Sequence, residues 1–381
     1  MKFNLQSIIL IAVTLIGCEY TNERENVYSE KIVHIPENEE IIYASRIISE
    51  MKMVELEKTQ ESLVGEIVKI ELSEEKLFIQ GKNYEGIKIF NSDGTFNKTF
   101  SNKGKGPGEY IEIQDFIIDS GRNTIEILDK KNNQIFVYDL RNYEFIESFP
   151  IPVQFAFKFV KQDNIYYFQT NGTQNKVNEK PTHSAIIAFN KNTLELIPLF
   201  KDETQTSNQF LEFSNIFYIS NDSEIFASFA WKQEIYHIYN QNCFPLIVID
   251  PGDRGFPETI LEGTPDDKLK YIFSDESKNK IGGFRLLFYK NGSFILAYGK
   301  GNSMNQYLYF SYADGKDTFA AKKVINDLSP IPLPDISIHK VIGNDIISII
   351  YPHEIEDQEI LINLGISEGD NPILIKYKLK S

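Results

Sequence analysis

Short stretches of alternating apolar and polar residues, each ended by a polar turn, recur along most of this chain. Five units read as hairpins: an aromatic-rich strand, a tight turn at Asp, Asn or Gly, and a second strand. A sixth unit, from Pro372 onward, holds only the first strand of such a pair. The five hairpins cover residues 86–100, 134–149, 184–200, 234–248 and 306–324. The pattern predicts an all-β protein.

The hairpins recur with a regular period. Two further short strands precede each hairpin, so each repeat holds four strands. The first three intervals between equivalent aromatic residues are about 50 residues, the length of a four-stranded propeller blade. The two longer intervals contain insertions, at about 251–281 and 352–370. The aromatic residues that end the third strands are Phe90, Tyr138, Phe189, Tyr239, Tyr312 and Tyr377.

One strand is missing at the end of the chain, and one is spare at the beginning. A strand-like stretch at 53–57 precedes the first repeat, and the last repeat lacks its outer strand. A ring closed by its own N-terminal strand explains both features, whereas a β-sandwich requires neither. We therefore predict a six-bladed β-propeller of four-stranded antiparallel blades, closed by the N-terminal strand. The expected blades are about 64–101, 113–150, 155–200, 214–249, 283–324 and 335–380 plus 53–57.

The N-terminus has the features of an exported protein. Lys2 precedes an apolar stretch at 8–16 that is too short for a permanent membrane span, which is typical of a signal peptide. Residues 15–18, Leu-Ile-Gly-Cys, resemble the bacterial lipobox, in which the cysteine becomes the lipidated first residue. Lipidation of Cys18 would leave Cys243 without an intramolecular disulfide partner. We expect a signal peptide at 1–17, a flexible polar tether at 18–40 and the propeller at 41–381.

The charge of the chain excludes one class of partner. The formal net charge is −15, and no basic run interrupts it. Such a field repels phosphate backbones, so we expect no binding to nucleic acid. We expect attachment to the membrane through the lipid instead, in the cell envelope and on the outer membrane.

A glycine-rich segment carries a family resemblance. Residues 104–110 read Gly-Lys-Gly-Pro-Gly-Glu-Tyr, and a strand begins at Asp115. With the lipobox and the strand-like stretch at 53–57, this segment resembles the six-bladed β-propeller lipoproteins of Bacteroidetes, which are related in shape to NHL-repeat and TolB-like propellers. The resemblance implies an exported propeller and supplies no catalytic residues. Strands flank the segment, so we interpret it as a crossover between blades, with φ > 0 at glycine, and not as a phosphate-binding loop.

Loop lengths distinguish the two faces of the predicted ring. Turns between first and second strands and between third and fourth strands are short, and they share one face, the short-turn face. The other connections, including both insertions, share the opposite face, the long-loop face. Because long loops on a rigid scaffold usually carry binding residues, we expect function on the long-loop face. The alternative is that these loops only cap the ring.

The first residues of the innermost strands are expected to converge at the mouth of the central channel. Carboxylates and amides there could hold a divalent cation, Ca²⁺ or Mg²⁺, through oxygen. Polar side chains at such positions also commonly bind backbone groups and water. The candidate metal ligands are Glu66, Asp115, Asn215 and Asp335, among strand starts that also include Gln154 and Gly283. The candidate ligand-binding residues are Trp231, His339 and Arg285.

These observations support three functional hypotheses. The first is a lipid-anchored binding module that recognises a peptide, a glycan or a partner protein on the long-loop face. The second is a metal-dependent hydrolase or lyase centred on the channel mouth, and the third is a structural role in an envelope assembly. The sequence has no Gly-x-Ser-x-Gly elbow and no paired histidines, so it favours a protein that is not an enzyme.

Overall fold

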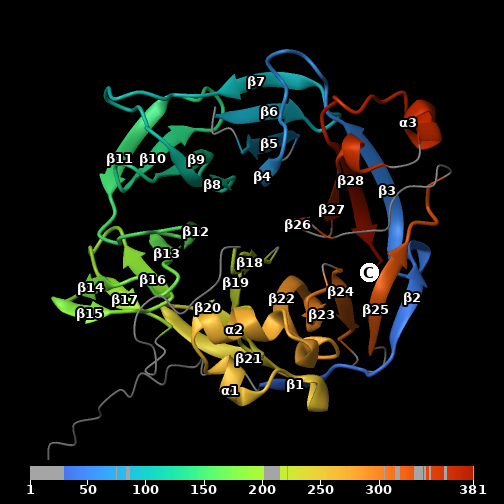
Figure 1. Ribbon diagram of the computed structural model, residues 1–381. Helices are drawn as coiled ribbons and strands as arrows, with labels where there is room; N and C mark the ends of the chain where they lie inside the picture. Colours follow the sequence, from blue (N-terminus) through green and yellow to red (C-terminus); the bar gives the residue numbers. More distant parts are fainter. Residues whose placement is uncertain are drawn as a thin grey trace, which may run out of the picture.

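A computed structural model shows that six small sheets form a closed ring (Figure 1). It describes residues 30–380 except 74, 83–85, 201–214, 221, 304, 314–317, 330–337, 339, 343–344 and 356–357. The predicted six-bladed β-propeller is confirmed. In each blade the four repeat strands are antiparallel, and consecutive strands run from the ring axis outward. Blade 3 carries an additional two-stranded hairpin, and blades 4 and 5 each carry a fifth strand.

The first three blades follow the predicted repeats in order. Blade 1 comprises β4 (Ile67–Ser73), β5 (Lys76–Gly81), β6 (Ile87–Asn91) and β7 (Phe96–Phe100). Blade 2 comprises β8 (Ile113–Asp119), β9 (Thr124–Asp129), β10 (Gln134–Asp139) and β11 (Phe145–Pro150). Blade 3 comprises β12 (Lys158–Gln162), β13 (Ile165–Gln169), β16 (Ile186–Asn190) and β17 (Leu196–Pro198), and its added hairpin comprises β14 (Asn175–Val177) and β15 (Lys180–Thr182).

The last three blades contain the insertions. Blade 4 comprises β18 (Phe217–Ile219), β19 (Ile225–Ser228), β20 (Glu234–Tyr239) and β21 (Asn242–Asp250). Blade 5 comprises β22 (Ile281–Lys290), β23 (Ser293–Lys300), β24 (Tyr307–Ser311) and β25 (Thr318–Ile325). Blade 6 comprises β26 (Lys340–Ile342), β27 (Asp345–Ile350) and β28 (Ile373–Leu379).

The N-terminal segment passes along the outside of three blades (Figure 1). Strand β3 (Ile48–Glu55) pairs antiparallel with β28, and Val54 lies opposite Leu374, so the predicted closure of the last blade is confirmed. Strands β1 (Lys31–His34) and β2 (Glu39–Tyr43) pair in parallel with β21 and β25. The expected flexible tether at 18–40 is therefore wrong for its described part, because outer strands of blades 4 and 5 offer free backbone groups that this segment satisfies.

An arginine fixes the bend between the first two outer strands. Arg254, in the 3₁₀ turn η2 (Gly252–Arg254), donates to the backbone oxygens of Ile35 at 2.9 Å and Pro36 at 2.6 Å. Its guanidinium also pairs with the carboxylate of Glu39 at 2.9 Å. The insertion that follows blade 4 thus holds the N-terminal segment in place.

The hydrophobic core is divided among the interfaces between blades. Six clusters of buried residues occur in the described part of the chain, and each lies between two neighbouring blades. The cluster between blades 6 and 1 includes Val54 and Leu56 from the closing segment. Closure of the ring therefore buries apolar side chains as well as pairing backbone groups.

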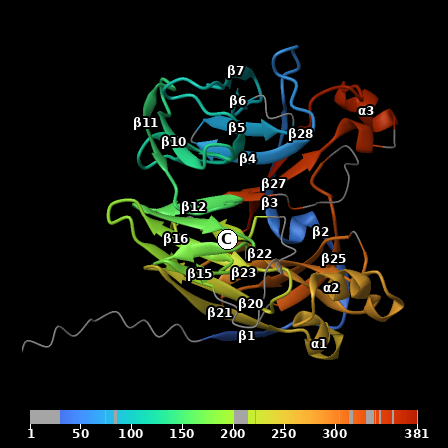
Figure 2. The same cartoon turned by 60° about the vertical axis from the view of Figure 1, so that its left-hand side comes forward.

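Each insertion lies in a connection of the long-loop face. The connection from β21 to β22 contains α1 (Glu258–Leu261), α2 (Pro265–Ile272) and η3 (Asp275–Ser277). The connection from β27 to β28 contains η4 (Pro352–Glu354) and α3 (Gln358–Leu364). Figure 2 shows α1, α2 and α3 on the same side of the ring. None of the helices among the described residues is long and apolar enough to cross a membrane.

The glycine-rich segment forms the crossover between β7 and β8, as predicted. Gly108 has φ +75°, and a Cβ at this position would lie 2.6 Å from the Phe145 ring, so only glycine fits. The hydroxyl of Tyr138 donates to the Gly108 oxygen at 2.9 Å, and the Glu109 carboxylate accepts from the Gly106 N–H at 2.8 Å. These contacts give the segment a structural role.

Candidate functional site

The innermost strands of the six blades place one residue each at the same register position. In every blade this residue lies opposite the fifth residue of the second strand, where the count starts at the turn that joins the first and second strands. We call these residues the axial ring. In blades 4 and 6 the paired residues end two positions before the ring, so we identify the ring residue by continuing the same pairing for two residues. The axial ring comprises Lys69, Asp115, Lys158, Asn215, Arg285 and Ile338.

A β-bulge directly precedes the axial ring in three blades. In β4, β8 and β22 the inner strand gains one extra residue just before Lys69, Asp115 and Arg285, respectively. Such bulges redirect the side chains that follow them and are frequent beside functional sites. Because three bulges occur at the same height along the ring axis, we consider the axial ring a candidate functional site.

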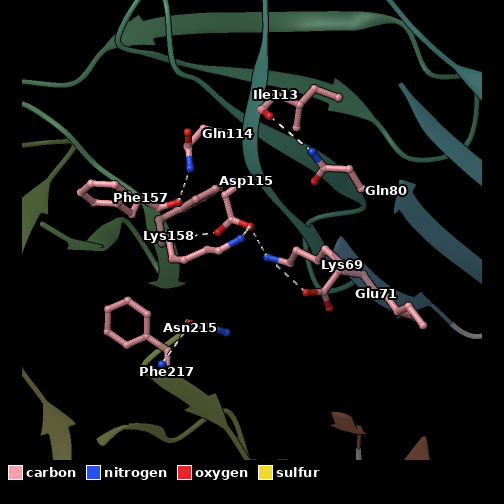
Figure 3. Close-up of polar contacts among 12 residues, drawn as sticks. Lys69, Glu71, Gln80, Ile113, Gln114, Asp115, Phe157, Lys158, Asn215 and Phe217 are labelled. Atoms are coloured by element: carbon pink, nitrogen blue, oxygen red, sulfur yellow. Dashed lines mark hydrogen bonds and ion pairs between the residues drawn. The ribbon is translucent and has the colours of Figure 1, made fainter. Parts of the chain in front are cut away.

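Asp115 is the centre of the charged network at this level (Figure 3). Its side chain is only 1% exposed, and one carboxylate oxygen lies 2.7 Å from the Lys69 Nζ and 3.6 Å from the Lys158 Nζ. The other oxygen accepts from the Phe159 N–H at 3.0 Å. The carboxylate of blade 2 is thus held by groups from blades 1 and 3.

The network continues toward blade 6 through a second carboxylate. Glu71, two residues along β4, lies 3.4 Å from the Lys69 Nζ and 2.7 Å from the Lys340 Nζ. Lys340 also donates to the backbone oxygen of Ile70 at 2.6 Å. Charges therefore alternate in the order Lys340, Glu71, Lys69, Asp115 and Lys158 across four blades.

These contacts shift the protonation equilibria of the buried groups. Burial opposes ionisation of Asp115, but Lys69, Lys158 and the Phe159 N–H together hold the pKa of this carboxyl below its usual range. Burial likewise opposes the charge on Lys69, and the two carboxylates outweigh it, so the pKa of this lysine is raised. Burial lowers the pKa of Lys340, despite the neighbouring Glu71.

The described candidate metal ligands do not form a metal-binding cluster. Glu66 pairs with Lys82 at 2.7 Å on the surface, and Asn215 accepts from the Phe217 N–H at 3.0 Å. The Asp115 carboxylate is engaged by two lysines, whose charges oppose a cation. No group of three or more His, Cys, Asp or Glu side chains that could hold a metal ion occurs in the described ranges.

Other predicted site residues are found in varied surroundings. Asp335, His339 and Cys18 lie outside the described residues. Gln154 lies four residues before β12, and its N–H donates to the Asn175 side chain at 2.6 Å. Gly283 has φ +67° within the bulge of β22. Burial raises the pKa of the Cys243 thiol to about 12, so this thiol stays protonated.

Trp231 supports the insertion on the long-loop face. Its ring centre lies 5.6 Å from that of Phe256, and Phe256 in turn packs edge-on against Tyr271 of α2 at 5.8 Å. The Nζ of Lys268 lies 5.5 Å from the centre of the tryptophan ring. The side chain is therefore partly covered by the insertion and anchors it to blade 4.

The helices of this face expose large apolar side chains. Phe273, at the end of α2, is 73% exposed, and Leu269 within α2 is 44% exposed. Ile362 of α3 is 75% exposed. Such side chains provide apolar area that a bound partner would cover. Sequence reasoning missed these residues, since it identified the insertions but not their exposed faces.

Comparisons with known proteins identify the family of this chain and a solved structure of similar fold. The sequence profile described as "Domain of unknown function (DUF4934)" matches residues 30–378. A Bacteroides fragilis protein described as exported has a similar structure, with a TM-score of 0.71 and 16% identity over 92% of this chain and 100% of that chain. A DUF4221 member from Bacteroides vulgatus aligns with a TM-score of 0.47 and 10% identity, covering 87% of this chain and 97% of that chain. No curated protein matches the sequence.

Proposed function

The chain belongs to the DUF4934 family, and from its geometry we propose that it is a lipid-anchored envelope propeller that binds a peptide, glycan or partner protein on its long-loop face. The proposal includes lipidation at Cys18 and attachment to the outer membrane. The similar Bacteroides fragilis protein is described as exported, which fits this location. An NHL-like or TolB-like relationship fits the same fold.

One observation carries the proposal. The inserted helices of the long-loop face expose Phe273 and Ile362, from connections in two different blades. Removing such side chains from water on binding a partner would contribute roughly 1.5–3 kcal/mol each.

Capture from envelope extracts tests the proposal. Phe273→Ser and Ile362→Ser should each reduce the amount of bound partner by about tenfold, because each removes apolar contact area. The matched control is Leu194→Ser, which alters a 71% exposed side chain in the turn between β16 and β17 on the short-turn face. All three proteins should keep the melting temperature of the wild type. If only Leu194→Ser lost its partners, binding would occur on the short-turn face and the proposal would be wrong.

A further inference from the structure

The axial ring is basic although the protein as a whole is acidic. Among the described residues, the axial ring contains three cationic side chains, Lys69, Lys158 and Arg285, and one carboxylate, Asp115. Adding Glu71 and Lys340, one step toward the short-turn face, gives four cationic groups and two carboxylates. The formal net charge of the whole chain is −15. Positive charge is thus concentrated near the axis against the overall field.

Solvent reaches this basic region. Asn215 and Arg285 are exposed, and the Lys158 and Lys69 side chains are 17% and 11% exposed. The Lys158 Nζ lies 3.6 Å from Asp115, which is longer than a hydrogen bond. This ion pair therefore leaves the ammonium able to donate to another group. The bulges before Lys69 and Arg285 occur at this same level.

We propose that the axial ring binds a carboxylate group of an acidic ligand, with Lys158 and Arg285 as its main contacts. This inference rests on the proposed function, because the ligand would reach the ring from the long-loop face. The ring pairs lysines with a carboxylate already, at Asp115, so the side-chain chemistry suits this group. The ligand would be an acidic glycan or an acidic peptide.

Two physical arguments favour a ligand with few negative charges over a cation or a polyanion. Excess positive charge at the ring repels metal cations, and the acidic exterior repels polyanions such as nucleic acid. A ligand with few carboxylates experiences a weaker repulsion from the exterior and the full attraction of the ring. The lowered pKa of Lys340 agrees with this view, because burial and the nearby Lys69 both disfavour its charge, and a bound anion would offset them.

Isothermal titration calorimetry of the purified full chain tests the inference. The acidic probes are trigalacturonate and triglutamate, and their neutral counterparts are trigalactose and triglutamine. Arg285→Gln and Lys158→Gln should each weaken binding of the acidic probe by roughly 10- to 100-fold, because each removes a charge-assisted contact. Lys322→Gln, an exposed change on β25, should leave binding unchanged.

Each outcome decides the inference. Tight binding of one acidic probe, with the neutral counterpart inactive, would support it and identify the ligand as glycan or peptide. Failure of both acidic probes to bind, equal binding of neutral probes, or wild-type affinity in Arg285→Gln and Lys158→Gln would overturn it. If the capture experiment still distinguishes the two faces, the proposed function survives the loss of this inference.

Discussion

At the scale of single residues, Asp115 shows how the inner strands of neighbouring blades are joined. It is almost fully buried, and its charge is balanced by lysines of blades 1 and 3. Asp115→Asn would leave the Lys69 and Lys158 charges without this partner. We expect the variant to lose about 3–5 kcal/mol of unfolding free energy, as measured by chemical denaturation. A loss below about 1 kcal/mol would show that the ion pairs contribute little.

The same residue predicts a pH dependence. Because the folded-state pKa of Asp115 lies below its unfolded value near 3.8, the carboxylate adds stability that is fully present above pH 3.8. This contribution is lost as the pH falls through the lower folded-state pKa. Unfolding curves recorded from pH 6 downward should therefore show a smaller acid-induced decline in Asp115→Asn than in the wild type. Parallel declines in the two proteins would contradict this assignment.

The residues of the axial ring could be predicted only in part from the sequence. Asp115 and Asn215 were identified as inward positions and do lie in the axial ring. Glu66 precedes β4, and its predicted place in the ring is taken by Lys69, after a bulge. Each bulge inserts one residue, and a sequence pattern of alternating polarity does not reveal it. The bulges therefore displaced the predicted ring positions of blades 1 and 5, and in blade 3 the inner strand begins four residues after the predicted Gln154.

At the scale of elements, the N-terminal strands are the least repetitive part of the fold. The closing strand β3 could be predicted, because the repeat count left one place empty. Strands β1 and β2 could not be, because four-stranded blades require no fifth strand and the segment is rich in charged residues. Their parallel pairing covers the outer edges of blades 4 and 5.

Truncation tests the contribution of the three outer strands to stability. A protein that begins at residue 30 should melt as the wild type does, because it keeps all three outer strands. A protein that begins at residue 58 loses β3 and the buried side chains of Val54 and Leu56, which contribute roughly 1.5–3 kcal/mol each. Its melting temperature, measured by calorimetry, should be lower than that of the protein that begins at residue 30. Equal melting temperatures for the two proteins would rule out closure by β3.

At the scale of the whole molecule, the sequence repeats specified the ring and the unequal loops specified its two faces. Six separate core clusters hold neighbouring blades together, so insertions can enlarge one face without disturbing the core. The inserted helices and the axial ring differ in chemistry: the first expose apolar side chains, and the second presents positive charge. A ligand with an apolar part and a carboxylate would use both.

Site-specific photo-crosslinking in living cells tests the central claim, binding on the long-loop face, most directly. A photoreactive amino acid would replace Ile362 on α3 or, as a control, Leu194 in the short turn of blade 3; both side chains are more than 70% exposed. We predict covalent adducts of defined mass from position 362 and none from position 194. Adducts from position 194 together with none from position 362 would contradict the claim.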